Sequence, residues 1–171
     1  MVAWEVTRSC NLACGHCRAS ALRGPYPGEL ATEKCLQLLD EIAAFAKPVI
    51  ILTGGEPLLR KDIYDIAAYG DAKGLRMVLA TNGTFVTEAV AERLLKVGIR
   101  RVSISLDGPD AASHDLFRGV PGAFDGSLAG IAAMKKAGLE FQINTTITQA
   151  NLAQIREIHD LAHDLGAAAH H

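Results

Sequence analysis

The sequence predicts an α/β fold in which parallel strands alternate with helices. Short apolar runs rich in β-branched residues recur along the chain, and between them lie stretches with apolar residues at three- and four-residue spacing. Strict alternation of strand and helix is typical of parallel sheets with right-handed crossovers. A doubly wound sheet and a full or partial (β/α) barrel both fit this pattern, and either fold places its chemistry at the carboxyl ends of the strands.

Five strands and five helices are expected in alternating order. The strands cover residues 2–7, 49–53, 75–81, 100–106 and 139–147, and the helices cover residues 33–46, 62–73, 88–97, 126–137 and 152–165. The continuously apolar residues 49–52 favour a strand that is covered on both faces. Candidate N-caps precede four of the helices and glycines follow four of them; these residues are Thr32, Thr87, Asp125 and Asn151, then Gly74, Gly98, Gly138 and Gly166.

Composition limits the classes of protein that the chain can belong to. Its 171 residues are 49% hydrophobic and 21% charged, which predicts one domain with one core. A net charge of -2 without a basic cluster argues against a nucleic-acid partner. The apolar runs are too short to cross a membrane and no signal peptide is present, so we expect a soluble cytoplasmic protein. Residues 166–171 lie where a sixth strand should begin, so the domain over residues 1–171 is expected to be incomplete at its C-terminal end.

Three of the four cysteines lie directly after the first strand, as Cys10, Cys14 and Cys17. Thiolates at this spacing can converge on a metal, because soft sulfur ligands select iron–sulfur clusters, zinc or copper(I). A structural zinc ion needs a fourth ligand, which His16 or Cys35 could supply, whereas a catalytic cluster can leave one iron open. The spacing therefore predicts a metal site and leaves the metal undecided.

The same loop contains a rival motif. Residues 14–17 read Cys-Gly-His-Cys, the dithiol motif of protein disulfide isomerases. No aromatic residue precedes it, Cys10 is unexplained by it, and the run of strand–helix units is too long for a thioredoxin-like domain. A dithiol oxidoreductase is thus a weaker hypothesis than a metal site.

Other polar and glycine-rich segments follow the remaining strands, at the edge where chemistry is expected. They are Gly54-Gly55-Glu56-Pro57, Asn82-Gly83, Asp107-Gly108 and Thr148-Gln149. With the cysteine loop after the first strand and Gly54-Gly55-Glu56-Pro57 after the second, the chain resembles the radical S-adenosylmethionine (SAM) enzymes. Thr81-Asn82-Gly83 and residues 103–108 extend the resemblance over essentially the whole chain.

The resemblance implies a partial (β/α)6, TIM-like barrel that is truncated before or at the sixth strand. In this family three cysteines hold a 4Fe-4S cluster, here Cys10, Cys14 and Cys17, and the fourth iron is chelated by S-adenosylmethionine. Reductive cleavage of S-adenosylmethionine gives a 5′-deoxyadenosyl radical that abstracts hydrogen from the substrate. An electron donor such as flavodoxin or ferredoxin is implied as a partner.

The resemblance also implies a set of cofactor-binding residues. Gly54 and Gly55 would let the cofactor run close to the backbone, and Glu56 would meet the ammonium of its methionine moiety. His16 would lie against the adenine, and Ser105 would bind the ribose. The remaining expected cofactor-binding residues are Pro57, Asn82, Asp107, Asn144 and Thr146.

A narrower likeness is to the branch that remodels tetrapyrroles in haem and haem d1 biosynthesis. It is carried by residues 4–8, 26–30, 65–70 and especially 114–124. A tetrapyrrole is therefore the expected small-molecule substrate. The alternative within the superfamily is a peptide-modifying maturase, and the alternatives from other classes are the structural zinc module and the dithiol oxidoreductase.

Several other residues have competing interpretations. Cys35 lies among leucines and is expected to be a buried thiol. His159 and His163 have the spacing of a metal pair but fall on the polar face of their helix. His114 and Arg118 are expected in a long loop after the fourth strand, in an ion pair or turn or in contact with substrate. His170 and His171 either begin the sixth strand, as the tetrapyrrole branch suggests, or are what remains after a truncation.

Overall fold

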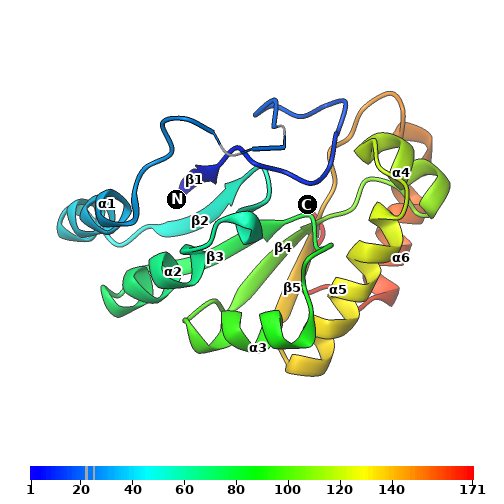
Figure 1. The fold of residues 1–171 in the computed structure, drawn as a ribbon. Coiled ribbons are helices and arrows are strands. Elements are labelled where there is room, and N and C mark those ends of the chain that lie inside the picture. Colours follow the sequence, from blue (N-terminus) through cyan, green and yellow to red (C-terminus); the bar gives the residue numbers. More distant parts are fainter. Residues whose placement is uncertain (22, 25) are drawn as a thin grey trace.

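The computed structural model describes residues 1–21, 23–24 and 26–171. Five parallel strands form one sheet in the order β1-β2-β3-β4-β5 (Figure 1). The strands are β1 (Val2–Thr7), β2 (Val49–Gly54), β3 (Arg76–Thr81), β4 (Arg101–Ser105) and β5 (Glu140–Asn144). All five lie where the apolar runs predict them.

In the described part of the chain, six α-helices and two short 3-10 helices accompany the strands. The α-helices are α1 (Thr32–Phe45), α2 (Ile63–Ala72), α3 (Glu88–Lys96), α4 (Ala111–Arg118), α5 (Ala123–Ala137) and α6 (Ile155–Asp164), and the 3-10 helices are η1 (Pro57–Leu59) and η2 (Leu152–Gln154). Within the part of the chain that the structure describes, no helix has both the length and the apolarity that a membrane crossing requires.

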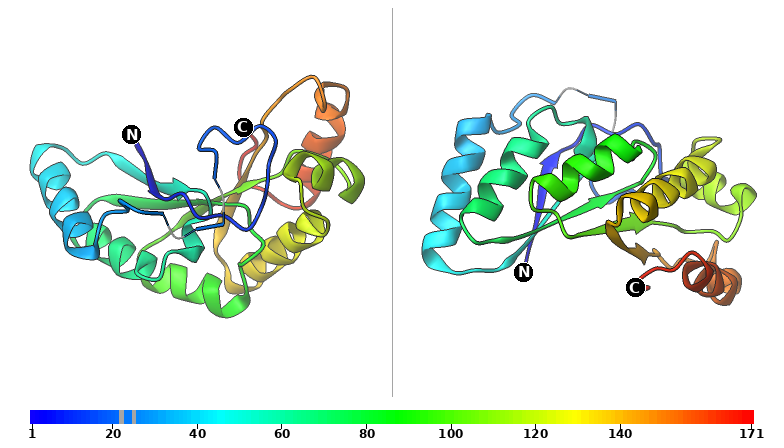
Figure 2. Two further views of the ribbon diagram at one scale, coloured as in Figure 1. Left: turned by 45° about the horizontal axis from the view of Figure 1, so that its top comes forward. Right: turned by 90° about the horizontal axis from the view of Figure 1, so that it is seen from below.

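The helices lie on one side of a curved sheet, as the two views of Figure 2 show. This arrangement and the sequential strand order are those of an open, partial (β/α) barrel rather than of a doubly wound sheet. On β2, Ile50 and Leu52 are fully buried, whereas Val49 and Ile51, which alternate with them, are only half-buried. The expected covering of residues 49–52 is therefore complete on one face only, and the other face forms the concave side of the barrel.

The main error of the sequence-based prediction is α4, which occupies part of the expected loop after β4. Asp110 caps this helix, because its carboxylate accepts a hydrogen bond from Ser113 N at 2.8 Å. Gly119 ends it in the left-handed conformation, at φ 69°. His114 and Arg118 consequently project from a helix and have fixed directions.

The helix ends show smaller differences from the expectation. Thr87 caps α3 as expected and accepts from Val90 N. Helix α5 begins at Ala123, after Gly122, so Asp125 lies inside its first turn. Asn151 accepts from Thr148 N at 2.8 Å and so orders the turn that leads into η2, without capping the helix by a side-chain bond.

Strand β5 ends earlier than expected, at Asn144, and a further segment lies beside it. Thr146 N leaves the ladder and donates to Asp107 Oδ1 at 2.7 Å. His170 forms a parallel bridge with Ile143, and His171 N donates to Ile143 O at 2.9 Å. The chain around His170 thus takes the position of a sixth strand. Of the two interpretations of this residue, the structure supports the start of the sixth strand.

Candidate functional site

A cavity of about 440 Å³ opens at the carboxyl ends of the strands, where the cysteine loop crosses the concave side of the barrel. The three clustered cysteines all line it. Six expected cofactor residues do so as well, namely His16, Gly54, Gly55, Asn82, Ser105 and Thr146. The structure therefore brings most of the predicted site into one place, although these residues come from four strands and one loop.

Backbone contacts fix the first half of the cysteine loop, residues 9–12, here called the loop base. Gly55 N donates to Thr7 O and Glu56 N donates to Ser9 O, each at 2.8 Å. A Cβ on Gly54 would overlap the carbonyl oxygen of Thr7, and one on Gly55 would overlap that of Ser9. Gly54 is thus required for close packing of β2 against the end of β1, and Gly55 for its packing against the loop base, whether or not a ligand also runs along them.

Side-chain amides extend this attachment to the end of β3. Asn82 Nδ2 donates to Asn11 Oδ1 at 2.9 Å, and Asn11 Nδ2 donates to Thr84 Oγ1 at the same distance. Asn82 Oδ1 in turn accepts from Thr84 N at 2.9 Å. Asn82 therefore borders the cavity while its side chain is engaged in holding the loop base.

Glu56 lies beneath the cavity wall and is fully buried. Its carboxylate accepts hydrogen bonds from Thr81 Oγ1 at 2.8 Å, Asn82 N at 2.9 Å and Leu58 N at 3.0 Å. Burial raises the pKa of Glu56, and these bonds oppose the increase. A cofactor ammonium could reach this carboxylate only by displacing one of its present donors.

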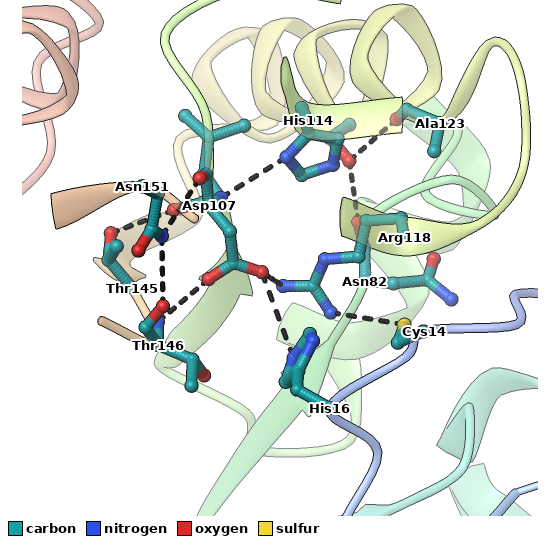
Figure 3. Close-up of polar contacts among 12 residues, drawn as sticks. Cys14, His16, Asn82, Asp107, His114, Arg118, Ala123, Thr145, Thr146 and Asn151 are labelled. Carbon is teal, nitrogen blue, oxygen red and sulfur yellow. Dashed lines mark hydrogen bonds and ion pairs between the residues drawn. The ribbon is translucent and has the colours of Figure 1, made fainter. Parts of the chain in front are cut away.

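A different set of contacts holds the second half of the loop, residues 13–17, here called the outer arm. Ala13 N donates to Arg118 O at 3.1 Å. The Arg118 side chain reaches back between Asp107 and the outer arm, where its Nη1 lies 3.6 Å from Cys14 Sγ (Figure 3). Its Nη2 forms an ion pair with Asp107 Oδ2. Helix α4 is thus attached to the cysteine loop by its backbone and by a buried charge.

Two histidines flank this ion pair. The His16 ring packs on Phe117 with centroids 4.2 Å apart, and its Nε2 lies 4.0 Å from Asp107 Oδ2. Burial lowers the pKa of His16, and the Arg118 charge adds to this effect. His114 is fully buried and accepts from Asp107 N through Nδ1 at 3.1 Å. Burial lowers its pKa to about 4, so it is neutral at pH 7.

Four of the expected cofactor residues do not line the cavity. Glu56 and Pro57 lie behind its wall, and Pro57 begins η1. Asp107 is buried and reaches the cavity only through the lining residues that it contacts, Arg118, His16 and Thr146. Asn144 accepts from Gln142 Nε2 at 3.0 Å along β5. Their assignment as cofactor-binding residues stays a prediction.

The three thiols have the chemistry that an iron–sulfur cluster requires. None of them is in a disulfide, and two of the sulfurs accept backbone N–H bonds, Cys10 from Leu12 and Cys17 from Ala21. Among the described residues, no three His, Cys, Asp or Glu side chains gather closely enough to hold one metal ion. The three thiols line one cavity, and an iron–sulfur cluster does not require them to share one ion because each thiolate binds its own iron.

The other singled-out residues lie apart from the cavity. Cys35 is fully buried, as expected, and accepts from Arg60 Nη2 at 3.2 Å. His159 and His163 are exposed on α6, as expected, and the His159 ring stacks on His170. Arg118 is the cavity residue whose position the sequence did not reveal, although an Asp at position 110 and a Gly at 119 carry the signal for its helix.

A partial parallel barrel with three thiols and a Gly-Gly turn around one cavity defines the class of radical SAM proteins. The profile of the radical SAM superfamily matches residues 4–162, and the chain belongs to this family. This membership confirms the predicted family. It argues against a structural zinc module and against a dithiol oxidoreductase.

Two curated relatives and one solved structure illustrate the membership. Over all 171 residues the chain is 53% identical to the AdoMet-dependent heme synthase of Nitratidesulfovibrio vulgaris, 47% of which is covered. It is 37% identical over 165 residues, or 96% of its length, to the mycofactocin maturase MftC of Mycobacterium tuberculosis, 42% of which is covered. The crystal structure of Streptococcus suis SuiB bound to precursor peptide SuiA superimposes with a TM-score of 0.83 at 20% identity, over 98% of this chain and 37% of SuiB.

The likeness to SuiB concerns the fold alone, and it confirms the predicted partial barrel. The chain spans less than half the length of these proteins.

Proposed function

We propose that the chain is the core domain of a radical SAM enzyme and that it holds a 4Fe-4S cluster through Cys10, Cys14 and Cys17. The observation that carries the proposal is the common cavity of the three thiols at the carboxyl ends of the strands. The bound cluster and S-adenosylmethionine would together supply a 5′-deoxyadenosyl radical for hydrogen abstraction. Residues 1–171 would form one core domain.

Different residues of the chain would contact different parts of the cofactor. Gly54 and Gly55 offer a backbone edge without side chains, and Ser105 and Thr146 offer hydroxyl groups. His16, in the outer arm, lines the cavity with an aromatic ring suited to stack on an adenine. We assign these five residues to S-adenosylmethionine.

The residues behind the wall would act on the cofactor indirectly. Glu56 holds Asn82 N and Leu58 N, so it shapes the turn that carries Gly55. Its expected contact with the cofactor ammonium would need an exchange of these bonds. Asp107 orients Arg118, and Pro57 and Asn144 complete the frame around the cavity.

For the whole enzyme we propose a tetrapyrrole substrate, in haem or haem d1 biosynthesis. The proposal is supported by the 53% identity over the full chain to a heme synthase. A peptide-modifying maturase is the second candidate, favoured by the 37% identity to MftC. An acidic electron carrier such as flavodoxin or ferredoxin would reduce the cluster in the cytoplasm.

The test is cofactor cleavage by the anaerobically reconstituted full-length protein with dithionite as reductant. We expect 5′-deoxyadenosine from the wild-type protein and none from the Cys14→Ala variant, with Cys35→Ala as a matched control that retains activity. Retained cleavage by Cys14→Ala would show that this loop is not the cluster site. Stimulation of cleavage by an iron tetrapyrrole supports the haem assignment, whereas stimulation only by a precursor peptide supports the maturase.

A further inference from the structure

Arg118 is a buried cation that the expected site did not contain. Its side chain is 7% exposed and lines the cavity together with Cys14 and His16. The 3.6 Å between its Nη1 and Cys14 Sγ is a hydrogen-bond contact, because sulfur is larger than oxygen. A guanidinium therefore lies directly against one of the three proposed cluster ligands.

Asp107 fixes the other side of the guanidinium. Its carboxylate is fully buried and forms an ion pair with Arg118 Nη2, an ion pair that lacks hydrogen-bond alignment. Asp107 is itself held from β5, because its Oδ1 accepts from Thr146 N at 2.7 Å. Figure 3 shows Arg118 between Asp107 on one side and Cys14 on the other. The positive charge is consequently nearer to the thiol than the negative charge is.

The backbone keeps this distance short. Ala13 N, one residue before Cys14, donates to Arg118 O at 3.1 Å. Gly119 follows in the left-handed conformation, at φ 69°, and a Cβ there would overlap Ala13 O. The end of α4 and the outer arm are thus in contact independently of the arginine side chain. The backbone of Arg118 therefore cannot move away from the outer arm without breaking this contact.

A fixed charge at this point has a predictable effect on an iron–sulfur cluster. The reduction potential of a cluster depends on net charge, on hydrogen bonds to its sulfurs and on burial. Reduction adds one negative charge, and a neighbouring cation in a low-dielectric site stabilises the reduced form more than the oxidised form. Arg118 should therefore raise the potential, and Asp107 should lower it by a smaller amount.

We propose that Arg118 is a positioning residue that holds the Cys14 thiolate and raises the reduction potential of the cluster, and that Asp107 orients it and moderates its charge. This inference rests on the proposed cluster at Cys10, Cys14 and Cys17. It adds a component that the cysteine motif does not contain. The component comes from α4, 104 residues away in the chain.

The test is a redox titration of the reconstituted cluster, followed by electron paramagnetic resonance without S-adenosylmethionine. In Arg118→Gln we expect the ratio of oxidised to reduced cluster at the wild-type midpoint to rise about tenfold, equal to a fall of ~59 mV for one electron. Asp107→Asn should move the midpoint in the opposite direction, and Arg118→Lys should remain nearest to the wild type. Arg101→Gln, which removes an arginine paired with Glu140 away from the cavity, is the matched control and should cause no shift.

Opposite shifts for Arg118→Gln and Asp107→Asn are a signature that loss of structure alone does not produce. The inference is overturned if neither variant moves the midpoint or if both move it in the same direction. If Arg118→Gln does not assemble a cluster, Asp107→Asn still gives the sign of the charge effect. Failure of the proposed function is distinguishable, because the wild-type protein would then take up no iron and sulfide.

Discussion

The two halves of the cysteine loop are held by different physical means. The loop base packs against β2 and β3 through backbone bonds and side-chain amides. Its close approach to β2 depends on the absence of a Cβ at position 55, and that of the preceding residue Thr7, at the end of β1, depends on the absence of a Cβ at position 54. The outer arm is held by α4, through one backbone bond and a buried charge pair. Steric fit therefore sets the position of the loop base, whereas electrostatics contributes to that of the outer arm.

The largest expected effect tests the steric fit of β2 against the end of β1, from which the loop base continues. Gly54→Ala would place a Cβ onto Thr7 O at a residue whose φ is 143°, so we expect the free energy of unfolding to fall by about 3 kcal/mol. The control is Gly15→Ala in the outer arm, where a Cβ would have no neighbour within 4 Å. Its effect should stay within about 0.5 kcal/mol in denaturant titrations. Equal losses for the two variants would refute the steric account.

The next effect concerns the buried groups around the Arg118–Asp107 ion pair, and it is tested by the pH dependence of stability. His114 has a pKa of about 4 in the folded protein against 6.5 as its ordinary value, so below pH 6.5 the unfolded state takes up a proton that the folded state does not. The contribution of neutral His114 to the free energy of unfolding is present in full at pH 7. The free energy of unfolding should fall by about 2 kcal/mol by pH 5 through this group.

In His114→Gln, whose amide oxygen can still accept from Asp107 N, the difference in unfolding free energy between pH 7 and pH 5 should shrink by this amount. Gly15→Ala again serves as the control, with the wild-type pH dependence. An unchanged pH dependence in His114→Gln would show that this histidine is not the buried neutral group described here.

The smallest effect concerns the amide contacts of the loop base. Asn11→Ala removes the bonds to Asn82 and Thr84, and we expect a loss of about 1 kcal/mol in unfolding free energy. Gln37→Ala, an exposed amide on α1 that bonds Glu41, is the comparison and should lose less. If both substitutions cost the same, the amide contacts of Asn11 do not hold the loop base.

The sequence predicted the loop base better than the outer arm, for a physical reason. Short motifs such as Gly54-Gly55 and Asn82-Gly83 lie at strand ends, and parallel strands bring their carboxyl ends together, so their meeting follows from the fold class. The contact of Arg118 with Cys14 needs the length and direction of α4. Asp110 and Gly119 mark that helix, but the apolar pattern between them is short, and it was interpreted as a loop. The burial of Glu56 depends on Thr81 and Leu58, whose contacts with it no spacing reveals.

The most direct test of the central claim is the electron paramagnetic resonance spectrum of the reduced, anaerobically reconstituted protein with and without S-adenosylmethionine. A cluster bound by Cys10, Cys14 and Cys17 with one open iron should give a 4Fe-4S signal that changes when S-adenosylmethionine is added. The same change should appear in Cys35→Ala and be absent in Cys14→Ala. A wild-type protein that holds stoichiometric zinc, or a cluster signal that S-adenosylmethionine leaves unchanged, would contradict the account.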